Sequence, residues 1–274
     1  MDGTFGVPPQ FCKLYTVHGL RANRTIPCAY ALLPNKQEAT YNNMCTQIRA
    51  VVPGAPQSVV TYFEKGAINA VADAYPGVDQ RGCLYHLTSN IYKNVQNRGL
   101  QPLYNNDNVF RQNIQFLSGL PLVPLADVID SFDTIVNNCG VQEQPILDYF
   151  EHTYIGTVRA RIRQNPMFAI DFWNLFDRVG ELPRTNNAVE GWHNAFSQSF
   201  PARNPDIWTI IRAIKKEEAL VRMAMGQIAA GVDPPLQKRV YRRINENLFT
   251  VVGDYHNRQR LDYLRGISYN LYRR

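Results

Sequence analysis

Two acidic residues, Asp2 and Glu190, are of the type that holds divalent metal ions for phosphoryl transfer. In such sites, carboxylates from different elements bind two Mg²⁺ ions, roughly 3.5 to 4 Å apart, which activate the attacking oxygen and stabilise the leaving one. Mg²⁺ prefers hard carboxylate oxygens, so two or three acidic side chains must converge on it. Spacing alone does not establish this role, because it does not distinguish two metal ligands from a surface aspartate and a solvated glutamate on a helix.

Cys83 and His86 form a Cys-x-x-His pair of a kind that occurs in zinc sites. A structural zinc site takes four ligands, and two do not make one. A buried thiol beside a hydrogen-bonded histidine is the simpler interpretation. We expect a structural role, with assistance to an active site as the second hypothesis.

The net charge of +6 and the sequence pI near 9.1 favour an anionic partner, such as nucleic acid or a membrane surface. Basic residues gather near the carboxyl end with tyrosines between them, beginning with Lys238, Arg239, Arg242 and Arg243. Such a segment can follow a phosphate backbone, and it is equally compatible with an ordinary solvated face.

The five cysteines are an odd number and are widely scattered, which favours a reducing compartment over a disulfide framework. No segment resembles a secretion signal, and no apolar run reaches the ~20 residues that span a bilayer. The sequence therefore predicts an intracellular protein that is neither secreted nor held in a membrane.

The elements that would position these residues begin as an α/β pattern. Residues 11–33 predict an antiparallel hairpin, and a helix with Tyr41, Met44, Ile48 and Val51 on one face follows it. Residues 58–63 then predict a short buried strand, and residues 68–75 a second amphipathic helix. We expect the helices to cover a mixed sheet.

After His86 the pattern becomes helical. Apolar spacing predicts helices around 84–95, 110–117, 125–136 and 146–150, and no convincing strand appears before residue 183. A helix through Val189, Trp192 and Phe196 and another from Asp206 follow. The fold class is therefore α/β, with a large all-helical insertion and a helical carboxyl-terminal part.

Several ordered blocks resemble the Mutator-like element (MULE) transposase domain. They are DGTF (2–5), YALLPNK with EATY (30–41), FEK with AINA (63–70), RGCLYHL (81–87) and TNNAVEGWH (185–193). The resemblance implies an RNase H-like core at 1–86, a helical insertion at 87–183, a core-completing helix at 184–200 and a basic helical extension at 201–274.

The same resemblance assigns roles to residues. It implies that Asp2 is the first metal-binding acid and Glu190 the third, with Mg²⁺ or Mn²⁺ as cofactor and none if the site is degenerate. Apart from the resemblance, Asn186 and Asn187 lie within one helical turn before Glu190, where they would orient its carboxylate or a phosphate. The resemblance also implies transposon-end DNA as partner and a nuclear location, and it leaves self-association open.

The second acid of the family would stand at the end of the strand 58–63, where this chain has Tyr62. A phenol with an unperturbed pKa near 10 is neutral at pH 7 and is a poor Mg²⁺ ligand. Glu64 is the substitute to consider, although in a continuing strand it would lie ~6.6 Å beyond Tyr62 on the same face. We therefore expect a core that does not cleave DNA.

The start of the sequence adds another expectation. An RNase H-like first strand would need apolar residues before Asp2, and these are missing. We therefore expect a sheet truncated at its first strand and a fragment, either of a decayed element or of an incomplete gene model. Two functions remain in competition. One is a DDE transposase catalytic domain, disarmed at Tyr62, and the other is a host-adopted DNA-binding or protein-interaction domain without chemistry.

Overall fold

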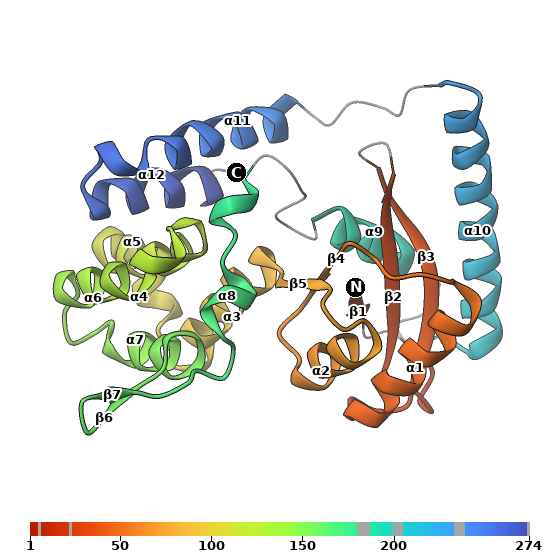
Figure 1. The fold of residues 1–274 in the computed structure, drawn as a ribbon, viewed down its shortest axis with the longest axis horizontal. Helices are drawn as coiled ribbons and strands as arrows, with labels where there is room; N and C mark the ends of the chain where they lie inside the picture. The colour runs from red at the N-terminus through yellow and green to blue at the C-terminus, as the bar shows by residue number, and fades with distance from the viewer. Residues whose placement is uncertain are drawn as a thin grey trace. The chain divides into compact units, whose positions relative to one another are not determined.

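The computed structural model describes residues 1–4, 7–21, 24–179, 187–198, 200, 205–232 and 239–272. The chain forms two compact units, and both of them are built from two separate stretches of sequence (Figure 1). The first unit comprises Met1–Gln80 and Asn186–Leu236, and the second comprises Arg81–Thr185 and Gln237–Arg274. The segment expected as one extension, 201–274, is thus divided between the units.

The first unit contains an antiparallel sheet in the order β1-β2-β3. Its strands are β1 (Asp2–Thr4), β2 (Lys13–Arg21) and β3 (Arg24–Leu33). Asp2 is paired with Thr16 and Gly3 with Tyr15, and a bulge interrupts the β2–β3 register between Val17 and His18. The hairpin predicted at 11–33 is confirmed.

A second pair of strands continues this unit. It consists of β4 (Ser58–Thr61) and β5 (Asp79–Gly82), and the chain enters the second unit within β5. The backbone nitrogen of Met1 donates to the carbonyl oxygen of Val60 over 2.8 Å, which brings β4 beside the start of β1. The predicted strand 58–63 therefore exists but ends at Thr61, and β5 was not predicted.

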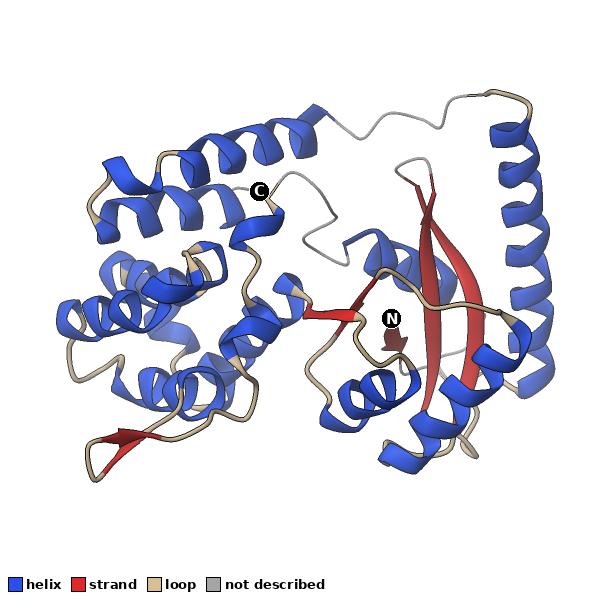
Figure 2. Ribbon diagram, in the orientation of Figure 1, coloured by secondary structure: helices blue, strands red, loops and turns tan. Residues whose placement is uncertain are grey.

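Helices cover both faces of the three-stranded sheet because successive strand residues point to opposite faces. Tyr15 and Leu33 pack with α1 (Glu38–Val51) and α2 (Lys65–Ala74), as predicted from their apolar spacing. Leu14 packs on the other face with Phe196 and Ile210, which belong to α9 (Asn187–Gln198) and α10 (Ile207–Ala229). The mixed α/β class is confirmed (Figure 2).

The second unit is mostly helical, and its helices form at most of the positions where apolar residues recur at helical spacing. Its α-helices are α3 (Leu84–Asn97), α4 (Gln101–Asn106), α5 (Asn108–Leu117), α6 (Val128–Asn138), α7 (Gln144–Phe150), α8 (Ile170–Trp173), α11 (Arg239–Gly253) and α12 (Arg260–Tyr272). Short turns of other helix types are η1 (Leu120–Leu122), η2 (Leu125–Asp127), η3 (Glu151–Ile155), η4 (Phe176–Arg178) and η5 (Tyr255–Asn257).

The core of the second unit is aromatic. Phe150 lies 4.9 Å from Tyr154, 5.9 Å from Phe132 and 6.1 Å from Trp173, measured between ring centroids. Tyr255, after α11, donates to the Asp127 carboxylate over 2.9 Å. The carboxyl-terminal helices are therefore an integral part of this unit.

The expectation of an all-helical region between His86 and residue 183 is wrong in one place. Strands β6 (Val158–Arg159) and β7 (Ile162–Arg163) form a short antiparallel hairpin, the small red arrow pair in Figure 2. Each strand has two residues, too few to show the alternation from which a strand is predicted.

Candidate functional site

Asp2 is the first residue of β1, and its backbone is paired with Thr16 of β2. Its side chain lies outside the described residues. The Oγ1 atom of Thr16 lies 2.8 Å from Nε2 of His193 in α9, and both residues are buried. Thr16 therefore links the backbone of Asp2, with which it is paired, to α9, which it contacts through His193.

Glu190 stands in α9, one helical turn before His193. Residues three apart on a helix lie on the same face, about 5–6 Å apart at Cβ, so the backbone brings the Glu190 position towards β2. The side chains of Glu190 and Asn187 and the whole of Asn186 lie outside the described residues, although Asn187 begins α9. The proposed roles of these three residues stay predictions.

Tyr62 follows the last residue of β4 and lies within a polar cluster on the α1 side of the sheet. Its hydroxyl group is hydrogen-bonded to Lys13 and to the Glu64 carboxylate, and it lies 3.2 Å from the Tyr41 hydroxyl. Since consecutive Cα atoms are 3.8 Å apart and the Met1 nitrogen is hydrogen-bonded to the Val60 carbonyl oxygen, the Cα atoms of Asp2 and Tyr62 are within roughly 18 Å of each other.

Lys13 is the residue that composition and spacing did not single out. Its ammonium nitrogen lies 2.6 Å from Oε2 of Glu64, and its side chain is 1% exposed. Period-two alternation puts Lys13 on the same face of β2 as Tyr15, and a lysine on an apolar strand face was the available signal. The nitrogen lies 5.4, 5.0 and 4.8 Å from the ring centroids of Tyr15, Tyr41 and Tyr62, within cation–π range.

Gly3 makes room for the Lys13 side chain as it crosses β1. A Cβ atom at Gly3 would lie 2.9 Å from Cδ of Lys13 and 3.3 Å from the Tyr15 ring. Glycine at this position therefore allows an ammonium group from β2 to reach the carboxylate that follows β4.

Electrostatics in this cluster depend on burial. Burial lowers the pKa of Lys13, while the hydrogen bond and the charge of Glu64 oppose this change. Burial also raises the pKa of Tyr41 far above its ordinary value, and Glu64 adds to the effect. The Tyr41 phenol is therefore neutral at pH 7, and it lies close to the salt bridge between Lys13 and Glu64.

The placement of Glu64 differs from the sequence prediction. The chain turns after Thr61, with the Glu64 nitrogen donating to the Tyr62 carbonyl oxygen over 2.9 Å. This turn returns the Glu64 carboxylate to the Tyr62 hydroxyl, so the two groups are in contact and not ~6.6 Å apart along a strand. Glu64 is therefore beside Tyr62, and its Oε2 atom lies 2.6 Å from the Lys13 nitrogen.

Residues 1–90 match the family model of the MULE transposase domain. The resemblance recognised in the sequence is confirmed over this stretch, which includes Asp2, Lys13, Tyr62 and Glu64. No curated protein and no solved structure matches the chain. The block at 185–193 lies beyond the matched residues.

Cys83 and His86 are within the match to the MULE transposase domain but belong to the second unit. Cys83 is fully buried at the start of α3, and the His86 ring lies 5.6 Å from the Tyr85 ring in an edge-to-face arrangement. Among the residues whose side chains are described, no group of three or more His, Cys, Asp or Glu is arranged to hold a metal ion. A structural role for Cys83 and His86 stays a prediction.

The predicted basic segment is partly described. Lys238 lies outside the described residues, while Arg239, Arg242 and Arg243 are exposed on α11. Their spacing of three and four places them on one side of the helix. None of the helices described here is both long and apolar enough to cross a bilayer.

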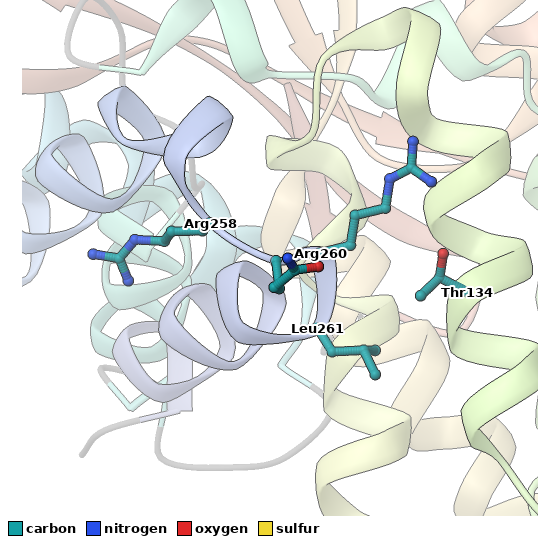
Figure 3. A pocket seen from close by; sticks show the side chains of 5 residues that line it. Thr134, Arg258, Arg260 and Leu261 are labelled. Atoms are coloured by element: carbon teal, nitrogen blue, oxygen red, sulfur yellow. The ribbon is translucent and has the colours of Figure 1, made fainter.

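A pocket of about 410 Å³ lies between α6 and the start of α12, lined by Thr134, Arg258, Gln259, Arg260 and Leu261 (Figure 3). Its two arginine side chains extend in different directions. Arg258 lies 2.7 Å from Asp254 and Arg260 lies 3.4 Å from Asp130. Because both guanidinium groups have carboxylate partners, the pocket does not resemble an anion site.

Proposed function

We propose that this chain is a transposase-derived core that binds duplex DNA without cleaving it. The match of residues 1–90 to the MULE transposase domain supports the origin of this core. The cluster of Lys13, Tyr62 and Glu64 supports the loss of metal-dependent chemistry. That cluster is the single observation on which the proposed inactivity rests.

The strand arrangement supports an RNase H-like core. In space, β3, β2 and β1 lie side by side in one sheet, and β4 and β5 form a second pair of strands. The hydrogen bond from Met1 to Val60 brings β4 beside the start of β1. Helices lie on both faces of the three-stranded sheet. In such a core the first and third acids, Asp2 and Glu190, would approach each other between β1 and α9.

Mg²⁺ does not fit the second acid position. The cation requires oxygen ligands that carry negative charge, but Tyr62 offers a neutral phenol and Glu64 already shares an oxygen with Lys13. Two like unit charges 4 Å apart repel each other by roughly 4 kcal/mol near a protein surface, and Mg²⁺ carries two charges. The ammonium group of Lys13 is therefore a resident cation that opposes a metal ion nearby.

Binding of DNA is proposed from the net charge and from the family. A net charge of +6 favours a polyanion, and a transposase core that has lost cleavage retains its electrostatic attraction to phosphates. Transposon-end DNA, self-association and a nuclear location are the corresponding expectations. The competing function is a DDE strand transferase with Mg²⁺ or Mn²⁺ held by Asp2, Glu190 and a substitute acid.

The test is cleavage and binding of labelled duplex DNA by the purified chain, with Mg²⁺ or Mn²⁺ present. We expect the parent chain to bind the duplex and to leave it uncut. We expect Tyr62→Asp alone to remain inactive, because Lys13 would neutralise the new carboxylate as it does Glu64. The double variant Lys13→Gln/Tyr62→Asp removes that cation, and Mn²⁺ binding should be at least tenfold tighter than for Tyr62→Asp.

The control is the same double variant with Glu190→Gln added, which removes the proposed third acid. Cutting by the parent chain that disappears with Glu190→Gln would overturn the proposed inactivity. Failure of the parent chain to bind duplex DNA at all would overturn the proposed binding function. Circular dichroism of each variant checks that the fold is kept.

A further inference from the structure

The β6–β7 hairpin in the second unit has a strained turn. Val158 pairs with Arg163 and Arg159 with Ile162, which leaves Ala160 and Arg161 as a two-residue loop. Both loop residues have positive φ angles, 49° and 66°. A two-residue hairpin loop with two positive φ angles normally contains Asn or Gly, and other residues at such angles are uncommon. Strained positions of this kind occur preferentially at binding sites.

The base of the hairpin is fixed to the helical unit. Arg163 donates to the Gly156 carbonyl oxygen over 2.6 Å and lies 3.4 Å from Glu151. The Gln164 nitrogen donates to the Thr157 carbonyl oxygen over 2.9 Å. Gly156 has φ of 93°, and a Cβ atom there would collide with the Gln164 carbonyl oxygen. The hairpin therefore projects from an anchored base.

The side chains on the projecting part are basic and apolar. Arg159 and Arg161 are exposed and have no ion-pair or hydrogen-bond partner among the described residues, whereas Arg163 has acidic partners. Val158 and Ile162 are 54% and 66% exposed. Residues 157–165 contain three arginines and no acid.

We infer that this hairpin is a contact surface for duplex DNA, an inference that rests on the proposed DNA-binding function. A two-stranded β-ribbon fits the major groove, which is about 12 Å wide. Arg159 and Arg161 provide guanidinium groups for phosphates or guanine edges, while Val158 and Ile162 provide apolar contacts such as those made with thymine methyl groups. The anchored base reduces the ordering cost of binding.

The experiment measures the affinity of the full chain for a labelled 30-base-pair duplex, at several salt concentrations from about 50 to 200 mM. The test variant is Arg159→Gln/Arg161→Asn, since Asn tolerates the positive φ at position 161. The matched control is Lys93→Gln/Arg98→Gln, which removes two exposed charges of the same unit from the end of α3.

We expect the slope of log K against log salt to fall by about two for the hairpin variant, because each phosphate contact contributes about 0.9. This corresponds to an affinity loss on the order of 60-fold at 0.1 M salt if binding is equal at 1 M. The control variant should change the slope by less than half as much.

Equal losses in the hairpin and control variants would mean that only total charge matters, and would overturn the inference. A hairpin variant that binds the duplex like the parent chain would also overturn the inference. These results differ from failure of the proposed function, in which the parent chain itself does not bind the duplex. Unchanged thermal unfolding of the variants shows that the hairpin variant remains folded.

Discussion

Lys13 and the arginine pair Arg159 and Arg161 are cations in opposite situations. Lys13 is buried in the first unit, and its charge is neutralised by Glu64 within hydrogen-bond distance. Arg159 and Arg161 stand on an exposed hairpin of the second unit, without a partner among the described residues. The charge of Lys13 therefore interacts within the fold, whereas Arg159 and Arg161 are available to another molecule.

This difference shows that the net charge does not distinguish buried, paired cations from exposed ones. A charge of +6 counts Lys13 and Arg161 alike, but desolvation and pairing remove Lys13 from any interaction with a polyanion. Steering of DNA depends on the exposed cations alone. A buried ammonium group near a candidate metal position instead acts against a second cation.

Removal of the buried cation is the largest expected effect. Lys13→Met leaves the Glu64 carboxylate, which is 15% exposed, without its counter-ion, and should lower the free energy of unfolding by about 3 kcal/mol. Urea denaturation in a Trp173→Phe background, followed by the fluorescence of Trp192 and Trp208 in the first unit, measures this loss.

The double variant Lys13→Met/Glu64→Leu is the sharper test, because replacement of a buried ion pair by apolar residues is often nearly neutral. It should recover most of the lost stability. If Lys13→Met alone is as stable as the parent chain, or no more harmful than the exposed Lys93→Met, the ion pair is not a structural feature and the comparison fails.

Gly156→Ala tests the anchored base of the hairpin. The left-handed backbone costs an L-residue about 1–2 kcal/mol, and relief of the collision with the Gln164 carbonyl oxygen adds a similar cost. We expect a total loss of about 2–3 kcal/mol in the second unit, measured by urea denaturation monitored through a probe attached to that unit. A loss below 0.5 kcal/mol would show that the base is not rigid.

These features differ in how far the sequence predicts them. Apolar periodicity predicted α1, α2, α3 and the β2–β3 hairpin, because each contains enough residues to show its period. It did not predict β6 and β7, whose two-residue strands and Ala160–Arg161 turn carry neither alternation nor an Asn-Gly signal.

The candidate site was predicted in part for a related reason. The resemblance to the MULE transposase domain pointed to Tyr62, but the turn after Thr61 that brings Glu64 back to it has no glycine or proline to mark it. Prediction of the Lys13 contact with Glu64 would have required the knowledge that β1 lies between β2, which carries Lys13, and β4. Such a non-local contact cannot be read from periodicity, which reports local structure only.

His18 provides a pH test of the first unit. Burial lowers its pKa to about 3 from 6.5, so between these values the unfolded chain binds a proton that the folded chain does not. The contribution of neutral His18 to the free energy of unfolding is therefore fully present above pH 6.5. It is lost as the pH falls towards 3, and the free energy of unfolding then falls by up to about 1.4 kcal/mol per pH unit. Urea denaturation of the parent chain and of His18→Gln between pH 7 and pH 4 should show a shallower dependence in the variant; equal slopes would contradict this.

Ala160→Gly is the smallest expected effect, and it separates strain from charge in the hairpin. Glycine removes the cost of a positive φ at position 160, about 1–2 kcal/mol, but loses more entropy on folding, about 0.4–1 kcal/mol. We expect a net gain in stability of about 0.5 kcal/mol, whereas Ala219→Gly in α10 should cost about 1 kcal/mol.

If the strain persists because it holds Arg159 and Arg161 towards DNA, Ala160→Gly should stabilise the second unit and weaken DNA binding severalfold with an unchanged salt slope. Greater stability together with unchanged affinity would show that the two arginines act by charge alone and that the turn geometry is not needed for binding.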